Sequence, residues 1–280
     1  MDQNSLLLSS AELKDRAKGA LNKKYGAFVA AIIIIFAVSL GCQIVISLFD
    51  SVLFGMILII KEMFSGNFTL EEIEQLAGDT SYIMGYMGYY TALDYVFQTI
   101  LSIFTAVFNI GISLLCLNAA CGRKVKISDI FYGFKHNFFK SIKLTALLAA
   151  ASQFYNIPLN IIVYMTQYGD LNSSGYFSVV ILLILLLGII IYVPISLNLS
   201  QIFFLTLDFP ERSAGDVIRQ SINIMKGHKL RLLYIQLSFI PLTFINMLTL
   251  GIGSLWLTPY YNVTYALFFL NLMQSKTNTD

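Results

Sequence analysis

The sequence is poor in charged residues, and this shortage excludes an ordinary water-soluble domain. Only 12% of the 280 residues are Asp, Glu, Lys or Arg, whereas 57% are hydrophobic. Soluble domains carry charge on about a quarter of their residues. Histidine occurs twice and cysteine three times, without a CxxC pair, an HExxH motif or a glycine-rich phosphate loop. We therefore expect a membrane protein without a metal ion and without a bound cofactor.

Charge is absent altogether from several long stretches. The first, Ala27–Phe49, has no charged residue, and it exceeds the roughly 20 residues with which an α-helix crosses the hydrocarbon core. Similar stretches recur further along the chain, near residues 95–118, 144–166, 177–207, 232–250 and 252–273. The expected fold is therefore all-α, a polytopic membrane helical bundle with six transmembrane helices.

Positive charge is confined to one side of this arrangement. Of the 18 Lys and Arg residues, only Lys61 falls in a segment that six alternating spans place on the opposite side. Lys and Arg mark the cytoplasmic side of a membrane protein. We expect a multi-pass plasma-membrane protein with cytoplasmic N- and C-termini, made of one integral membrane domain over residues 1–280. Its parts are a cytoplasmic amphipathic helix at 1–26, a six-span bundle at 27–273 with an outer segment at 51–92, and a cytoplasmic tail at 274–280.

Three cytoplasmic segments share a helical pattern. Ser9 with Glu12, and Ser213 with Asp216, have the spacing of a capping box, and Ser128 predicts a third N-cap. Apolar residues then follow at helical spacing, as Leu13, Ala17 and Leu21; Ile127, Ile130, Phe131, Phe134 and Phe138; and Val217, Ser221, Ile224 and Met225. We predict three interfacial amphipathic helices, each preceding a transmembrane hairpin. Whether this threefold pattern reflects internal duplication stays open.

The outer side of the first hairpin is less regular. Residues 27–60 contain one charged residue, Asp50, and are too long for one span and too short for two. We expect the first span to end near Asp50 and residues 51–60 to lie along the outer surface. Asp50 and Asp94 would then reach water at the outer ends of their spans.

A basic cluster precedes the fifth span, formed by Lys226, His228, Lys229 and Arg231. Each cation near an anionic leaflet gains about 1 kcal/mol, so orientation of the chain in the membrane is a sufficient explanation. The alternative is a specific site for an anionic lipid headgroup or a phosphate. In both interpretations these residues are candidate contacts for anionic lipid.

Amide side chains in the third and fourth spans could form a polar seam. Gln153, Asn156 and Asn160 follow one another at i, i+3 and i+7 on one helical face, and Asn198 and Gln201 follow Pro194 in the fourth span. Amides between membrane helices commonly stabilise their packing. The functional alternative is a narrow uncharged path or a groove for lipid headgroups.

The C-terminal half carries a resemblance to a known family. The stretch "DFPERSAGDVIRQSINIMKGHKLRLLYIQLSFI", followed by "GIGSLWLTPYYNVTYALFF", resembles the multi-pass Gram-positive bacterial membrane family known as domain of unknown function number 975. The matching features include Asp208 and Pro210 and the M-K-G-x-K run at Met225–Lys229. "ELKDRAKGALNKKYGAF" and "ISDIFYGF" are also similar to the family. The resemblance implies a polytopic bacterial membrane protein and no known activity.

Two functional hypotheses follow. The first is a non-enzymatic membrane scaffold or regulatory protein that binds an anionic lipid surface and partner proteins. The alternative is a facilitator or lipid translocator that uses the polar seam, and a membrane-embedded enzyme ranks third. The expected partners are membrane lipids with anionic headgroups at the cytoplasmic face, with partner proteins or further copies of this chain left open, and no nucleic acid.

Overall fold

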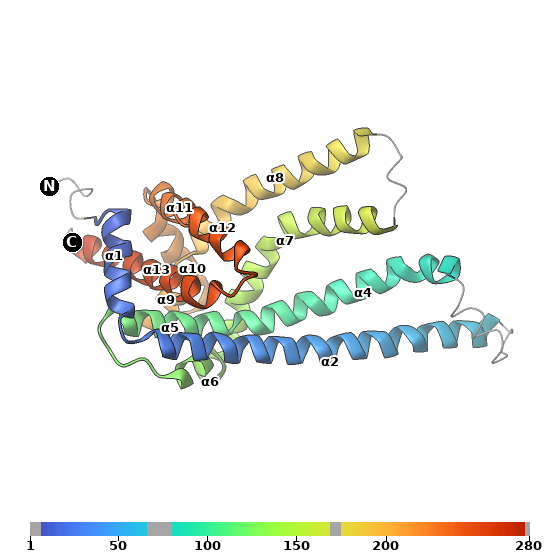
Figure 1. Ribbon diagram of the computed structural model, residues 1–280, viewed down its shortest axis with the longest axis horizontal. Coiled ribbons are helices and arrows are strands. Elements are labelled where there is room, and N and C mark those ends of the chain that lie inside the picture. The colour runs from blue at the N-terminus through green and yellow to red at the C-terminus, as the bar shows by residue number, and fades with distance from the viewer. Residues whose placement is uncertain (1–6, 66–79, 169–174, 278–280) are drawn as a thin grey trace.

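The described part of the chain is almost entirely helical. The computed structural model describes residues 7–65, 80–168 and 175–277 (Figure 1). In chain order its helices are α1 (Ser10–Leu21), α2 (Tyr25–Ser65), α4 (Thr80–Ala106), α5 (Phe108–Ala120), the 3-10 helix η2 (Ile127–Phe131), α6 (Tyr132–Lys135), α7 (Phe138–Tyr168), α8 (Gly175–Leu199), α9 (Ile202–Asp208), α10 (Ala214–Met225), α11 (Lys229–Leu237), α12 (Ile240–Leu248) and α13 (Ser254–Thr277). No β-strand occurs in these residues, and the all-α prediction is confirmed.

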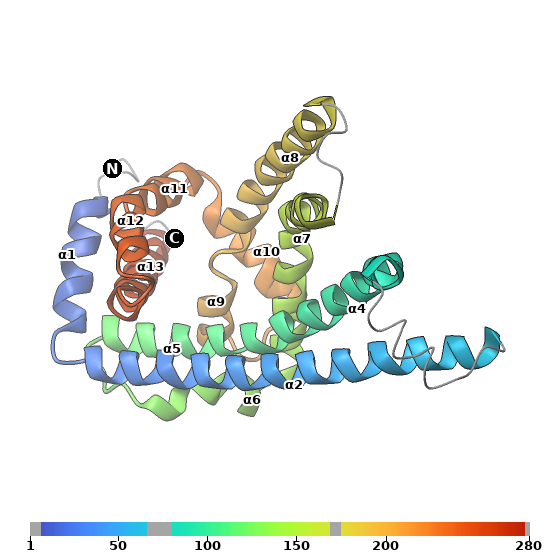
Figure 2. The ribbon, with the colours of Figure 1, turned by 45° about the vertical axis from the view of Figure 1, so that its right-hand side comes forward.

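The helices form a base and two arms. We call the part built by α1, α5, η2, α6, α9, α10, α11 and α13 the base. From it extend two helical pairs, α2 with α4 and α7 with α8, which we call the arms (Figure 1). Figure 2 shows that α1 lies across one end of the base. It also shows that the α7–α8 arm diverges from α2 with increasing distance from the base.

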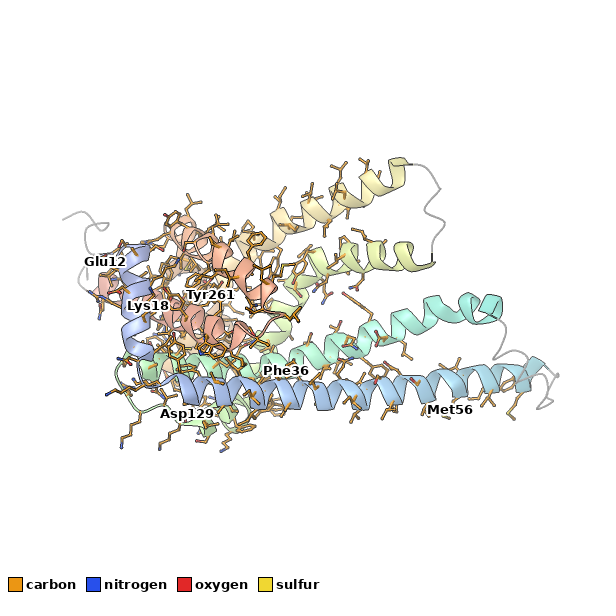
Figure 3. All side chains as sticks on the ribbon, in the orientation of Figure 1. Glu12, Lys18, Phe36, Met56, Asp129 and Tyr261 are labelled. Atoms are coloured by element: carbon orange, nitrogen blue, oxygen red, sulfur yellow. The ribbon has the colours of Figure 1, made fainter. Side chains whose placement is uncertain are left out.

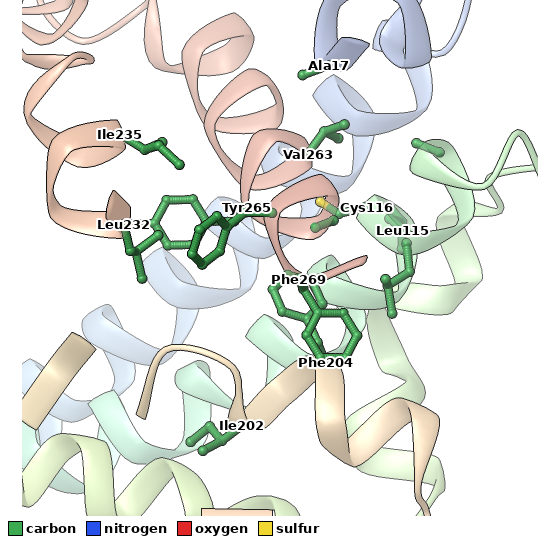
Figure 4. Packing of buried hydrophobic residues seen from close by; sticks show 14 of the residues in the cluster. Ala17, Leu115, Cys116, Ile202, Phe204, Leu232, Ile235, Val263, Tyr265 and Phe269 are labelled. Carbon is green, nitrogen blue, oxygen red and sulfur yellow. The ribbon is translucent and has the colours of Figure 1, made fainter. Parts of the chain in front are cut away.

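The hydrophobic core lies in the base around α13. Phe268 and Phe269 of this helix are fully buried, and the ring of Phe204 from α9 stacks on Phe269 with 5.3 Å between centroids (Figure 4). Leu115 and Cys116 of α5 complete this contact from another side. The base therefore holds together through burial within the protein itself.

The arms expose their apolar residues instead. The exposed side chains of α8 include Leu183, Leu187 and Ile190. On α2 they include Phe36 and Met56, which point out of the protein (Figure 3). An exposed apolar surface of this extent is typical of a protein embedded in lipid. Four helical segments are long and apolar enough to cross a membrane, namely Tyr25–Ile57, Leu93–Ala120, Leu182–Asp208 and Lys229–Leu248.

Two of the six expected spans are not among these four. The stretch 144–166 lies in α7, whose mean hydropathy is lowered by several amide side chains, and 252–273 lies in α13, where Thr, Tyr and Asn alternate with apolar residues. Both helices are nevertheless long enough to cross, since about 20 residues suffice.

The helix that contains the first expected span does not end near Asp50, where we expected the span to end. Helix α2 continues without a break from Tyr25 to Ser65, about 60 Å at 1.5 Å per residue. Residues 51–60 contain no proline and are rich in Leu, Ile and Met, which continue a helix readily. Because residues 66–79 lie outside the described residues, the expected outer segment 51–92 is described only in part.

The middle amphipathic segment is broken, so the prediction of an N-cap at Ser128 is wrong. Ser128 lies inside η2, and the chain breaks again at Asn137, which has a positive φ of 52°. The cause is close packing against α5. A Cβ on Gly111 would overlap the main chain of Ile130, and one on Gly133 would lie 2.8 Å from the carbonyl oxygen of Val107.

The predicted N-caps of α1 and α10 are confirmed. The Ser9 hydroxyl accepts a hydrogen bond from the N–H of Glu12 at 3.2 Å, and the Glu12 carboxylate accepts one from the N–H of Ser9 at 2.7 Å. Ser213 caps α10 by accepting from the N–H of Asp216 at 3.2 Å.

The predicted apolar stripes of α1 and α10 are buried against protein. Leu13, Ala17 and Leu21 of α1 face α13 and α5, whereas the corresponding residues of α10 face α8 and α9. Protein, and not lipid alone, therefore covers the apolar faces of these two helices.

Candidate functional site

The basic cluster lies at the break between α10 and α11. Gly227 adopts a positive φ of 80° there, a conformation that glycine reaches without a steric cost. Lys226 ends α10 and is exposed, whereas His228 precedes the first turn of α11 and Lys229 begins it, both partly buried. Sequence reasoning placed these residues together, and the structure brings these three to one corner of the base.

Arg231 points away from that corner and into the protein. Its guanidinium donates to the main-chain oxygen of Leu8 and to Oδ1 of Asn271 at 3.1 Å, and it lies over the ring of Phe268. Oδ1 of Asn271 also accepts from the N–H of Leu8 at 3.0 Å. Arg231 thus joins α11 to α13 and to the segment before α1, which makes it a structural residue more than a lipid contact.

An exposed apolar row continues from the basic corner. Leu230 is 80% exposed, Tyr234 65% and Leu237 51%, and their i, i+4 and i+7 spacing puts them on one face of α11. We call these three residues the α11 face. The pattern of cations followed by an exposed apolar face is typical of a helix that enters the membrane from its anionic surface.

Three lysines lie against carbonyl oxygens at the C-terminal ends of helices other than their own. Nζ of Lys14 lies 2.9 Å from the carbonyl oxygen of Ser238 at the end of α11, and Nζ of Lys24 lies 3.3 Å from that of Ala119 in the last turn of α5. Nζ of Lys140 lies 3.3 Å from the oxygen of Phe209, just after α9. The last carbonyls of a helix lack partners within it and carry partial negative charge. Each lysine therefore fastens one helix to another.

Burial has an electrostatic cost at two of these lysines. It lowers the pKa of Lys14, and the neighbouring Lys18 lowers it further. Burial also lowers the pKa of Lys140, although the carboxylate of Glu211 opposes this shift. The ring of Phe239, whose centroid lies 4.3 Å from Nζ of Lys14, offsets part of the cost of burying this positive charge. Sequence reasoning took these lysines as orientation signals and missed their capping role, for which no local signal exists.

The amides of α7 are used mainly within their own helix. Nε2 of Gln153 donates to the oxygen of Ala149 at 3.1 Å, and Nδ2 of Asn156 donates to Oγ of Ser152 at 3.1 Å. Asn160 is exposed and donates to the main-chain oxygen of Asn156 at 2.9 Å. Gln153 also makes a contact between helices, because its Oε1 accepts from the Tyr95 hydroxyl of α4.

The amides at the end of α8 lie beside a different part of α7 from the amides of α7 itself. Helix α8 crosses α7 where Gly188 meets Phe154, and near this crossing the rings of Tyr155 and Tyr192 lie 4.8 Å apart. In this antiparallel register, Asn198 and Gln201 approach the start of α7, while Gln153, Asn156 and Asn160 lie toward its far half. Oδ1 of Asn198 and Oε1 of Gln201 are buried without a partner among the described residues. The structure therefore places the amides of the predicted polar seam in two separate groups.

Asp50 does not reach water from the protein surface, contrary to our prediction. Its side chain is 0% exposed on α2, and neither carboxylate oxygen has a hydrogen-bond donor among the described residues. Asp94 of α4 lies against it, within hydrogen-bonding reach. Among those same residues, no group of three or more His, Cys, Asp or Glu side chains could hold a metal ion.

Residues 7–276 match the model of the family described as "Protein of unknown function (DUF975)". The chain belongs to this family. No curated protein and no solved structure matches it. In this DUF975 protein, the M-K-G-x-K run at Met225–Lys229 forms the α10–α11 break, where Gly227 provides the left-handed turn. The turn at Asp208–Pro210 presents the Phe209 and Pro210 carbonyls to Lys140.

Proposed function

We propose that this protein is a non-enzymatic scaffold or regulator in a bacterial plasma membrane. The end of the base that carries the exposed Lys and Arg residues would face the cytoplasm with both termini, and the chain would cross the membrane six times, with α11–α12 and α13 as the last pair. The observation that carries the proposal is the α11 face, which adjoins Lys226 and Lys229. That arrangement suits a surface where the protein meets anionic headgroups and acyl chains together.

Exposed basic residues around the base support the proposal that the protein binds an anionic lipid surface. They are Arg16, Lys18, Lys23, Arg123, Lys124, Lys126, Lys135, Lys143, Arg219 and Lys226. Each cation close to an anionic leaflet contributes about 1 kcal/mol. Because the base is joined internally by its core and its lysine caps, it offers partner proteins a rigid charged surface.

Native mass spectrometry of the protein in nanodiscs containing phosphatidylglycerol tests the lipid part. We expect wild-type protein to retain this lipid, and the double variant Lys226→Gln/Lys229→Gln to retain clearly less. The matched control is Lys23→Gln/Lys124→Gln, which removes the same charge away from the α11 face. Equal retention by the two double variants would sink the lipid-surface proposal.

The scaffold part is tested by identifying what stays bound to the protein after gentle release from its own membrane. A partner protein in fixed stoichiometry supports it. Transport or conversion of a substrate by the purified protein alone, in sealed vesicles, contradicts it.

A facilitator or lipid translocator is the second candidate, favoured by the buried and unpartnered oxygens of Asn198 and Gln201. Such oxygens could accept hydrogen bonds from a polar solute or headgroup. Replacing Asn156, Asn160, Asn198 and Gln201 by Leu should then abolish transport while membrane abundance is unchanged. Loss of abundance would show that the amides serve packing alone.

A further inference from the structure

Two carboxyl groups meet between the helices of the first arm. Asp50 is fully buried where α2 packs on α4, and both its oxygens lack a donor from the described residues. The ring of Phe49, the residue before Asp50, is in edge contact with the ring of Phe97, about one turn along α4 from Asp94, with 5.6 Å between centroids, which fixes the register of the two helices. Asp50 therefore cannot turn toward solvent while the pair stays packed.

The partner that faces Asp50 is also acidic. Asp94 lies within hydrogen-bonding reach of it, and Oδ1 of Asp94 accepts from Nε2 of Gln98 at 3.2 Å. Among the described side chains of α4, the titratable neighbour of Asp94 in sequence is Tyr95, whose hydroxyl is directed to Gln153 of α7. Helix α4 contains no Lys or Arg, and the only one in α2 is Lys61, about three turns beyond Asp50. Among the described side chains of α2 and α4, no cation is thus available to neutralise the pair.

We propose that Asp50 and Asp94 form a proton-binding site, in which one proton is shared between the two carboxyl groups inside the membrane arm. Two ionised carboxylates only accept hydrogen bonds, so their contact becomes favourable once one of them carries a proton. Adjacent carboxylates cannot both ionise without strong repulsion, and an apolar environment increases that repulsion. An ionisable pair within a membrane segment is by default a functional site.

A proton fits this site better than a metal ion. Calcium needs about six to eight oxygen ligands and magnesium about six, whereas two carboxyl groups meet here and no larger acidic group occurs among the described residues. The amide nitrogen of Gln98 also points its hydrogens at Asp94, which a bound cation would oppose. When the pH rises and the proton is lost, the two negative charges repel, and α2 and α4 separate. The site therefore makes the first arm responsive to pH.

Labelling with dicyclohexylcarbodiimide tests the proposal, because this reagent modifies carboxyl groups that carry a proton in apolar surroundings. The full-length protein in nanodiscs is labelled over a range of pH and the adducts are located by peptide mass spectrometry. The variants are Asp50→Asn and Asp94→Asn, and the matched control is Asp15→Asn, which removes an exposed acid from α1. Melting temperatures establish that each variant is folded.

We expect one adduct per chain at neutral pH, on Asp50 or Asp94, and a decline as the pH rises. In either variant the remaining acid faces an uncharged amide and has no second carboxyl group with which to share a proton, so it should be labelled clearly more slowly than in the wild type at neutral pH. Asp15→Asn should label as wild type does. Absence of labelling in the wild type, labelling of both pair variants at the wild-type rate, or protection by added sodium or calcium at constant pH would each overturn the proposal.

Discussion

At the scale of single residues, polar side chains of the base serve mainly to join segments that are distant in sequence. Asn271 is the clearest case, because its Oδ1 accepts from both the Leu8 N–H and the Arg231 guanidinium. The carbonyl caps made by lysines work in the same way. The polar groups of this apolar protein are therefore essential to its packing.

Replacing Asn271 by Ala should destabilise the protein by about 1–3 kcal/mol, since the partly buried Arg231 guanidinium loses one of its two acceptors and the main-chain N–H of Leu8 loses its acceptor. Thermal unfolding in detergent measures this effect. The control is Gln274→Ala, an exposed amide on the same helix, which should change little. Equal effects of the two substitutions would show that the Asn271 contacts are not stabilising.

The α1 capping box predicts a dependence on pH. Hydrogen bonds from the Ser9 main chain and hydroxyl lower the pKa of Glu12. A carboxylate whose pKa is lower in the folded than in the unfolded protein contributes stability at neutral pH, and this contribution is lost as the pH falls through the folded pKa. Glu12→Gln keeps a capping side chain without its titration. Its melting temperature should therefore fall less than that of wild type on acidification, and identical falls would contradict this account.

Residues with local partners could be predicted from sequence, whereas those with distant partners could not. The Ser9 and Ser213 caps follow from a spacing of three residues. Arg231 and Lys140 instead meet carbonyls of segments far along the chain, and nothing near them in the sequence indicates this. For the same reason, the burial of Asp50 against Asp94 was not predicted.

At the scale of helices, close packing depends on a few glycines. A Cβ on Gly188 would overlap the carbonyl oxygen of Phe154 and lie 2.8 Å from its carbonyl carbon, so α7 and α8 could not keep their present contact. Gly188→Ala should therefore lower the melting temperature or the membrane abundance markedly. The control is Gly41→Ala in α2, where a Cβ meets nothing within 4 Å. A neutral Gly188→Ala variant would contradict the observed crossing.

The lysine caps give a second prediction for helix packing. Lys14→Met keeps most of the apolar stem but leaves the carbonyl of Ser238 without its cation, and should cost about 1 kcal/mol. Unfolding of this variant is compared with that of Lys124→Met, which removes an exposed lysine. If the two variants unfold alike, capping by Lys14 contributes nothing measurable.

Helix type was predictable from hydrophobic periodicity, and helix ends were less so. The apolar stripes of α1 and α10 are buried as their spacing predicts. The prediction for the middle segment was wrong because the break in its helix depends on the close approach of η2 to Gly111. This is a contact between two separate elements, which local sequence does not indicate. Helix α2 passes Asp50 because packing on α4 shelters that residue, which composition alone does not reveal.

At the scale of the whole molecule, low charge and long apolar stretches predicted the membrane class, and four segments are apolar enough to cross. The division into a base and two arms was not predicted, since it depends on which apolar faces meet protein and which stay exposed. The last hairpin differs from the arms in how far it extends from the base. Its turn after α12 lies short of the far ends of both arms (Figure 1).

Cysteine accessibility in intact cells tests the proposed topology most directly. In a variant without native cysteines, single cysteines replace Lys124 and Lys226 in the base, Met63 near the end of α2, and Ile252 in the turn before α13. The account predicts that a membrane-impermeant maleimide labels positions 63 and 252 from outside, and positions 124 and 226 only after permeabilisation. Labelling of 124 or 226 from outside, or a position 252 that reacts from neither side, would contradict six crossings with the basic end of the base in the cytoplasm.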